Sequence, residues 1–362
     1  MTTFTPDRRS SGGSRVNTSR RTDMRIVHPV AWAACAFVAS LAVLSGAAKA
    51  DDQAIVMKVS VPTINDTLHH YAQIFAAAVE KDSHGRIKGE VYPASQLGSI
   101  PRQIEGVQFG SIQAVALPPE FCVGIDERFE VLTAPALVSS MSQAEAVAAD
   151  PAVQKLMLGL GANKGLHGVG LFIATPSSIV SRAPIRHLAD LKGKKIRVFT
   201  SDFQKVSLER LGATPVAMTL GDVLPAIQQG AIDGALAGMP VYTTMHYVDA
   251  AKYVTDTGQP FIFLIAEVSQ KWYASLPKDL QVVIDKDGAA MARQNYKFAV
   301  DFLEKATKDW VTQGGELISL PPDEQSAAMV TLASVGQDIS KPKPQLAAAY
   351  KVVTDSAKAH AK

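Results

Sequence analysis

The chain has 362 residues, of which 47% are hydrophobic and 19% are charged, and its formal net charge is +2. This length is enough for two or three domains with packed cores, and the composition excludes both a disordered chain and a polytopic membrane protein. Seven of the 36 basic residues but only two of the 34 acidic residues lie in positions 1–50, so the remainder carries a net charge of −3. A mildly acidic chain lacks the basic excess that phosphate neutralisation requires, so we expect no nucleic-acid partner.

Residues 1–50 have the order of a secretory signal peptide. A basic stretch over 1–28 precedes an apolar run over 30–44, and the small-residue sequence Ala48-Lys49-Ala50 ends the segment. The apolar run is too short to span a bilayer comfortably, so we predict cleavage after Ala50 and export to the periplasm. Because the basic stretch is unusually long, translation from Met24 is an open alternative.

After the signal peptide, strands and helices alternate in a pattern that occurs twice. The first unit is predicted as strand 56–61, helix 65–81, strand 90–92, helix 100–109 and strand 112–117. The second is predicted as strand 195–199, helix 203–211, strand 215–218, a helix opened by a capping box at Thr219–Asp222, and strand 232–236. We expect Gly110, Gly212 and Gly230 to end helices.

The repeated unit predicts an α/β fold with two lobes, each built on a mainly parallel sheet flanked by helices. The alternative is one large doubly wound sheet. Residues 277–314 are predicted to form one long helix that bridges the lobes, because about 30 residues reach roughly 45 Å. We expect a signal peptide over 1–50, lobe I over 51–175, lobe II over 176–262, and a crossover with the bridging and C-terminal helices over 263–362.

No catalytic, metal or cofactor site is recognisable in the chain. The phosphate loop, the H-E-x-x-H zinc motif and the G-x-S-x-G nucleophile motif are all missing. His69 and His70 are adjacent and would point about 100° apart on a helix, so they cannot chelate one ion. Cys122 has no evident His partner, and we expect it to be buried. We therefore predict no catalytic residue, no metal and no cofactor.

Arg197 is the most informative charged residue. In strand 195–199, Ile196 and Val198 face one side while Arg197 and Phe199 face the other. Arg197 lies near the carboxyl end of that strand, which is where ligands bind in open α/β sheets. Its guanidinium fork suits a carboxylate held by two parallel hydrogen bonds, although a surface salt bridge is the simpler alternative.

Three stretches carry the most specific motifs of the chain. They are VYPASQLGSIPRQIEGVQFGSIQ from residue 91, LKGKKIRV from 191 with LGATPVAMTLGDVLPAIQQGAIDG from 211, and EVSQKWYASLP from 267. In this order, over nearly all the mature chain, they resemble the TRAP-type periplasmic solute-binding proteins of the DctP family. The resemblance implies two lobes that close around a small organic acid and deliver it to membrane permease subunits driven by an ion gradient.

The resemblance also implies the binding residues. Arg197 matches the carboxylate-clamping arginine of the family, and Thr200 follows it where a polar ligand contact is frequent. Thr63, Asn65 and Glu120 fall in pocket-lining regions of the first lobe, where turn and cap roles are equally good explanations.

The chain departs from the family pattern in ways that predict a less polar pocket. Thr175–Ser178 replace the neighbourhood of a second arginine, and Leu220 stands where an aromatic residue is frequent. Ala237 and Met239 lie where many members have Glu-Asn-Pro. We therefore expect a monocarboxylate, such as a keto, hydroxy or aromatic acid, rather than a sialic acid or a compact C4-dicarboxylate.

These observations predict an exported solute receptor of a TRAP transporter and not an enzyme. A binding protein for an ABC importer or a sensor remains an alternative. A secreted α/β enzyme is the second alternative, against which the missing nucleophile, acid–base pair and metal ligands argue.

Overall fold

The computed structural model describes residues 54–258 and 260–361, and residues 51–362 form one compact unit. The predicted signal peptide and its cleavage site lie outside the described residues. Within the described ranges, no helix combines the length and the hydropathy that crossing a bilayer would need.

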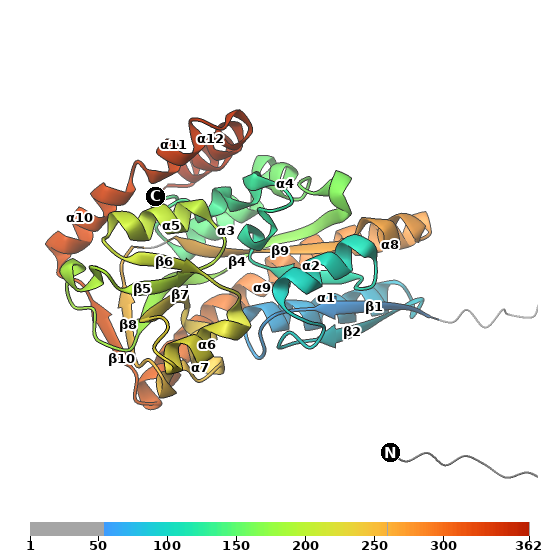
Figure 1. Cartoon of the computed structure of the whole chain (residues 1–362). Coiled ribbons are helices and arrows are strands. Elements are labelled where there is room, and N and C mark those ends of the chain that lie inside the picture. The colour runs from blue at the N-terminus through green and yellow to red at the C-terminus, as the bar shows by residue number, and fades with distance from the viewer. Residues whose placement is uncertain (1–53, 259, 362) are drawn as a thin grey trace, which may run out of the picture. The chain divides into compact units, whose positions relative to one another are not determined.

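Two β-α-β-α-β units are present, as the repeat predicted (Figure 1). The first unit, residues 55–117, consists of β1 (Ile55–Ser60), α1 (Thr67–Asp82), β2 (Ile87–Tyr92), α2 (Ile100–Phe109) and β3 (Ala114–Leu117). The second unit, residues 195–238, consists of β5 (Lys195–Val198), α5 (Asp202–Arg210), β6 (Thr214–Ala217), α6 (Leu220–Gln228) and β7 (Gly234–Gly238). In each unit the first strand lies in the middle and pairs in parallel with the other two.

Two long antiparallel strands join the sheets of the two units. They are β4 (Leu166–Ser181) and β9 (Phe261–Ser269). β9 pairs with β3 of the first unit, and β4 pairs with β9 and then, over 177–181, with β7 of the second unit. The hydrogen-bonded order is therefore β2-β1-β3-β9-β4-β7-β5-β6, with β8 (Tyr253–Asp256) and β10 (Glu316–Ser319) attached beside β4. The two units thus share one continuous path of strands.

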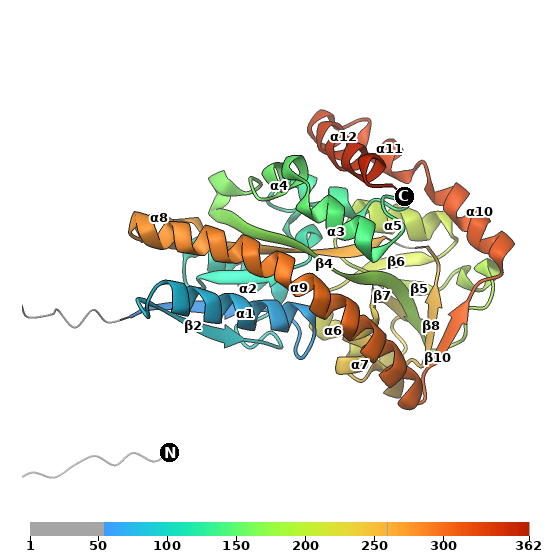
Figure 2. The ribbon, with the colours of Figure 1, turned by 180° about the vertical axis from the view of Figure 1, so that it is seen from behind.

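A single long helix, α9 (Lys278–Thr312), packs along both units (Figure 2). It contacts α1 of the first unit, β4 in the middle, and the short helix α7 (Met239–Thr244) after the second unit. Its buried face includes Ala299, Ala306 and Trp310, while Phe302 and Leu303 are half-buried. The prediction of one helix that spans both units is confirmed.

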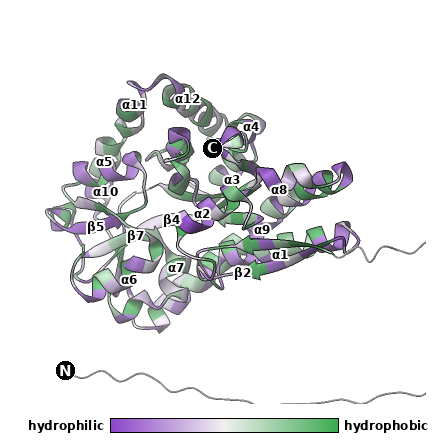
Figure 3. Ribbon diagram, turned by 45° about the vertical axis from the view of Figure 1, so that its right-hand side comes forward, coloured by the Kyte–Doolittle hydropathy of each residue, from purple (hydrophilic) through white to green (hydrophobic). Residues whose placement is uncertain are grey.

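The remaining helices cover the sheet and the edge of the second unit. They are α3 (Met141–Ala149), α4 (Pro151–Met157), α8 (Gln270–Ser275), α10 (Pro322–Leu332), α11 (Val335–Ser340) and α12 (Pro344–Ala359). Short 3₁₀ helices include η1 (Pro119–Cys122) and η2 (Glu127–Thr133). α12 packs on α3, α4 and η2. Hydrophobic and hydrophilic residues are interspersed along these outer helices (Figure 3).

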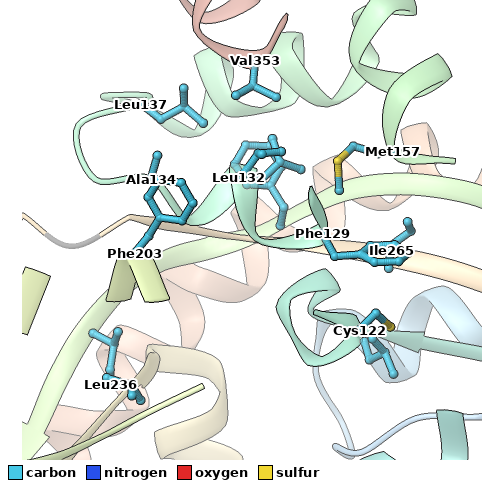
Figure 4. Close-up of a cluster of buried hydrophobic side chains, with 14 of the residues drawn as sticks. Cys122, Phe129, Leu132, Ala134, Leu137, Met157, Phe203, Leu236, Ile265 and Val353 are labelled. Atoms are coloured by element: carbon cyan, nitrogen blue, oxygen red, sulfur yellow. The ribbon is translucent and has the colours of Figure 1, made fainter. Parts of the chain in front are cut away.

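Two hydrophobic clusters fill the interior. One takes side chains from α2, α5, η2 and α12, and includes Phe129, Leu132, Phe203, Leu236 and Val353 (Figure 4). The other takes them from α1, α6 and α9. In each unit the two helices therefore contribute to different clusters, as expected when successive right-handed crossovers cover opposite faces of a sheet.

The predicted helix ends at Gly110 and Gly230 are confirmed, but the predicted capping box does not form. Gly110 and Gly230 have φ of 84° and 73°, the left-handed region that glycine enters without strain. At the start of α6, the Thr219 hydroxyl donates to the Asp222 carboxylate at 2.7 Å instead of accepting from a backbone N–H. The prediction of a capping box is therefore wrong, because the Thr219 and Asp222 side chains hydrogen-bond to each other.

Replacing Gly288 by Ala should destabilise the protein, because α9 touches β4 there. A Cβ at Gly288 would lie 2.7 Å from both the Cβ and the carbonyl oxygen of Val169. We expect the free energy of unfolding to fall by about 1–3 kcal/mol. Gly221→Ala in α6 is the matched control, because a Cβ there would meet nothing within 4 Å. Urea denaturation measures both, and equal stability of the two variants would contradict this packing.

Candidate functional site

A small cavity lies where the carboxyl ends of β1, β3, β5 and β7 meet. The first unit contributes the loop after β1 and the first turn of α1, and the second unit contributes residues of β5, α6 and β7. β4 and β9 close it from the middle of the sheet. We call it the central cavity; its volume is about 50 Å³. Its position is the one at which open α/β sheets bind ligands.

Arg197 is the dominant charged group of the central cavity. The side chain is 1% exposed, and its guanidinium is held by carbonyl oxygens at the ends of the two neighbouring strands. Nε donates to the oxygen of Met218 at 2.9 Å, and Nη1 donates to the oxygen of Leu236 at 3.1 Å. Nη2 has no hydrogen-bond partner among the described residues. The strand positions therefore fix the fork and leave one of its nitrogens unused.

The electrostatic environment of Arg197 is unbalanced. Burial lowers the pKa of the guanidinium to about 10, and the nearby Tyr247, Tyr242 and Glu120 offset only part of this effect. The group stays charged at neutral pH, although both of its hydrogen-bond acceptors are neutral carbonyls. Because a buried charge without a counter-charge is costly, the site favours an incoming anion.

Apolar side chains form most of the remaining wall. The ring of Phe199 lies under the guanidinium, with Cζ of Arg197 4.4 Å from the ring centroid. The ring of Phe121 follows at 5.3 Å from that of Phe199. Leu220 and Ile262 also line the cavity and are buried. Such a wall excludes water and strengthens any ion pair that forms inside.

The start of α1 supplies the second polar part of the wall. Thr63, Asp66 and Thr67 all line the cavity and are at most 4% exposed. Asp66 caps the helix, because its Oδ1 accepts a hydrogen bond from the N–H of His69 at 3.1 Å. Burial raises the pKa of Asp66 to about 6, against several hydrogen bonds that favour the charged form.

Of the eight residues expected in the site, four line the central cavity. They are Thr63, Arg197, Leu220 and Ala237. The other four, Thr200, Met239, Asn65 and Glu120, lie outside its lining.

Each of these four has another place in the structure. The Thr200 hydroxyl donates to the carbonyl oxygen of Glu120, and Met239 is buried in a hydrophobic cluster at the start of α7. Asn65 adopts a φ of 56°, and its backbone N–H donates to the ring of His69 at 3.0 Å. Glu120 is buried behind the cavity.

Sequence reasoning did not place Asp66, Thr67 or Phe121 in the site. Asp66 is the N-cap of α1 and Thr67 is its first residue, and this place at the helix start puts both at the carboxyl end of β1. Phe121 belongs to η1, a short 3₁₀ turn that leaves no periodic pattern in the sequence.

No metal centre accompanies the site in the described ranges, where no three His, Cys, Asp or Glu residues are placed to share an ion. Cys122 is buried, as predicted, and burial raises the pKa of its thiol.

Glu120 is a buried carboxyl whose protonation should control part of the stability. Burial raises its pKa from 4.5 to about 8, and the Coulombic attraction of Arg197 counteracts this only in part. Between these values the unfolded chain is ionised at this residue while the native chain still holds the proton. Native stability therefore falls as the pH rises through that window.

Glu120→Gln should remove this loss of stability. Relative to the unchanged protein, the variant should gain on the order of a few kcal/mol in the free energy of unfolding between about pH 5 and pH 8. Urea denaturation at both pH values measures the difference. A difference that stays constant with pH would contradict a protonated Glu120.

Comparisons with known proteins assign the chain to a family. The family model for "Bacterial extracellular solute-binding protein, family 7", DctP, matches residues 59–342. The C4-dicarboxylate-binding periplasmic protein DctP of Rhodobacter capsulatus is 25% identical over 270 residues, which are 74% of this chain and 80% of that protein. An uncharacterized protein of Salmonella typhimurium, YiiZ, is 30% identical over 193 residues, which are 53% of this chain but only 58% of YiiZ.

The fold of this chain also matches the fold of solved structures. The sugar acid binding protein DctPAm from Advenella mimigardefordensis, in complex with galactonate, superposes with a TM-score of 0.80 at 20% identity, over 85% of this chain and 99% of that chain. The family model covers most of the described residues and the fold agrees with it. The chain therefore belongs to the DctP family of bacterial extracellular solute-binding proteins, and it is a binding protein rather than an enzyme.

Proposed function

We propose that this protein is the periplasmic receptor of a TRAP transporter, that Arg197 clamps the carboxylate of a small organic acid in the central cavity, and that the loaded receptor delivers the acid to a membrane permease. The observation that carries the proposal is the buried guanidinium whose Nη2 has no partner among the described residues.

Arg197 has hydrogens left for a bidentate contact. Nη1 carries two hydrogens and gives one to Leu236, and Nη2 gives neither of its own to the protein. A carboxylate could therefore accept two parallel, charge-assisted hydrogen bonds from one fork. The same contact would supply the counter-charge that the buried cation lacks.

The charges of the cavity favour a monocarboxylate. Among its lining residues, Arg197 is the only Lys or Arg, and the nearest other charged lining residue is the acidic Asp66. A second carboxylate on the ligand would therefore meet no cation and would face a like charge. The similar proteins named above bind acids according to their names, a C4-dicarboxylate and galactonate, so an acid ligand agrees with the family.

We further propose that residues 51–175 and 176–262 act as two lobes that close over the ligand. The ligand shifts the population toward the closed form by as much as it prefers that form. The hydrogen bond from Thr200 to Glu120 joins these two segments beside the cavity, which supports closure at this place.

Replacing Arg197 should abolish tight binding of the acid. A thermal-shift screen of small mono- and dicarboxylic acids identifies a ligand, because bound ligand stabilises the native state. Calorimetry should then show Arg197→Ala weakening that ligand at least about 100-fold, with Arg197→Lys also weakened because the fork is lost.

Arg186→Ala is the matched control for this experiment. Arg186 is exposed, pairs with Glu316 at 2.6 Å, and is not among the residues that line the cavity, so its loss should leave binding unchanged. Circular dichroism confirms that each variant is folded. Tight binding of succinate or malate that survives Arg197→Ala would contradict the proposal.

Export should remove the predicted signal peptide. In a cell with a periplasm, we expect the exported protein to begin at Asp51, because Ala48-Lys49-Ala50 has the small-residue pattern of a cleavage site. N-terminal sequencing of the periplasmic fraction measures this. A full-length chain retained in the cytoplasm would contradict the periplasmic role.

A further inference from the structure

Three buried polar atoms that lack hydrogen-bond partners belong to residues lining the same cavity. They are Nη2 of Arg197 and the hydroxyl oxygens of Thr63 and Thr67. These residues are 1%, 3% and 2% exposed, so bulk water does not reach them. The other unpartnered polar atoms of the described residues belong to side chains outside this lining. Unpartnered buried groups are costly, and three around one cavity point to a polar ligand.

The two hydroxyl groups lie on either side of Asp66 in the sequence, at the N-terminus of α1. The Thr63 hydroxyl is near enough to the Asp66 carboxyl to favour its charged form, but it lacks the geometry of a full hydrogen bond. Oδ1 of Asp66 accepts from the N–H of His69, and a carboxylate can accept further hydrogen bonds through its second oxygen. This corner of the cavity therefore offers hydroxyl groups that donate or accept, and a carboxylate that accepts.

A ligand hydroxyl suits this corner better than a ligand ammonium or a second carboxylate. The positive end of the dipole of α1, a helix of 16 residues, lies there and disfavours a cation. The Asp66 carboxyl disfavours a second anion, and its pKa of about 6 keeps it mainly ionised at neutral pH. A neutral hydroxyl can donate to Asp66 and accept from a threonine. It is therefore repelled neither by the positive end of the α1 dipole nor by the Asp66 carboxylate.

The size of the cavity limits the length of the ligand. Its volume of about 50 Å³ is well below the roughly 150 Å³ of an engineered cavity that holds benzene, so binding of any organic acid requires the walls to move apart, and a short acid requires the least movement. The walls between the polar ends are apolar, with Phe121, Leu220 and Ile262 among them. A short carbon chain therefore fits better than a fully hydroxylated sugar acid.

We propose that Thr63, Asp66 and Thr67 form a hydroxyl-binding subsite opposite the carboxylate clamp, and that the ligand is a short hydroxy-monocarboxylate. This inference rests on the proposed function of Arg197 as the carboxylate clamp.

A matched series of four-carbon acids tests the subsite. Calorimetry compares butyrate, 2-hydroxybutyrate, 3-hydroxybutyrate and 2-aminobutyrate on the full mature protein. The better hydroxybutyrate should bind at least about tenfold tighter than butyrate, the difference that one hydrogen bond to a charged group supplies. The amino acid should bind more weakly than that hydroxy acid.

Isosteric variants separate the hydroxyl contacts from packing. In the double variant Thr63→Val with Thr67→Val, the preference for the hydroxy acid over butyrate should fall to within about threefold. The control variant, Thr63→Ser with Thr67→Ser, keeps both hydroxyl groups and should keep the preference. Thermal unfolding shows that both double variants are folded.

The outcomes distinguish the subsite from the clamp. If butyrate binds as tightly as the hydroxy acids, if the amino acid binds best, or if the preference survives the valine substitutions, the subsite is overturned. It is also overturned if none of the four acids binds. In each of these cases, the proposed carboxylate clamp is still supported if Arg197→Ala weakens the binding of another acid. It is contradicted if Arg197→Ala weakens the binding of no acid.

Discussion

A buried arginine without an anionic partner is the constraint on which the site depends. Arg197 sits on the middle strand of the second unit, between β6 and β7, and backbone carbonyls of both flanks hold its guanidinium. The backbone can orient the fork but cannot neutralise it, because carbonyl oxygens are neutral acceptors. A cation fixed in this way is preorganised for a carboxylate, since little side-chain entropy remains to be lost on binding.

The same strand end also connects the segments 51–175 and 176–262. After β5, the Ser201 hydroxyl lies 2.6 Å from that of Thr133, and the N–H of Asp202 donates to the Glu130 carboxylate at 2.6 Å. Both partners belong to η2, so hydrogen bonds cross between the segments within a few residues of Arg197.

Much of the fold could be predicted from the sequence, because periodicity and glycine helix ends are local signals. The site was only partly predictable, since its lining depends on where chain segments meet. Arg197 could be predicted to lie at the site because the carboxyl end of its strand is recognisable in the sequence. Met239 could not, because α7 begins at that residue and packs it into the core, while Gly238 lines the cavity. Asp66 has a sufficient local role as the cap of α1, which conceals its position at the cavity.

At positions where many family members have polar residues, this chain has less polar ones, and these make the cavity less polar. Thr175 lines the cavity and lies in the neighbourhood where a second arginine is frequent in the family. If Gly238 carried a Cβ, that atom would lie only 2.2 Å from Cγ2 of Thr175. The threonine and the glycine therefore pack as a pair, with no room for a longer side chain at either position unless the wall moves. Without a second cation, that wall offers no counter-charge to a second carboxylate. On the function proposed for Arg197, selectivity follows from the missing charge as much as from the guanidinium that is present.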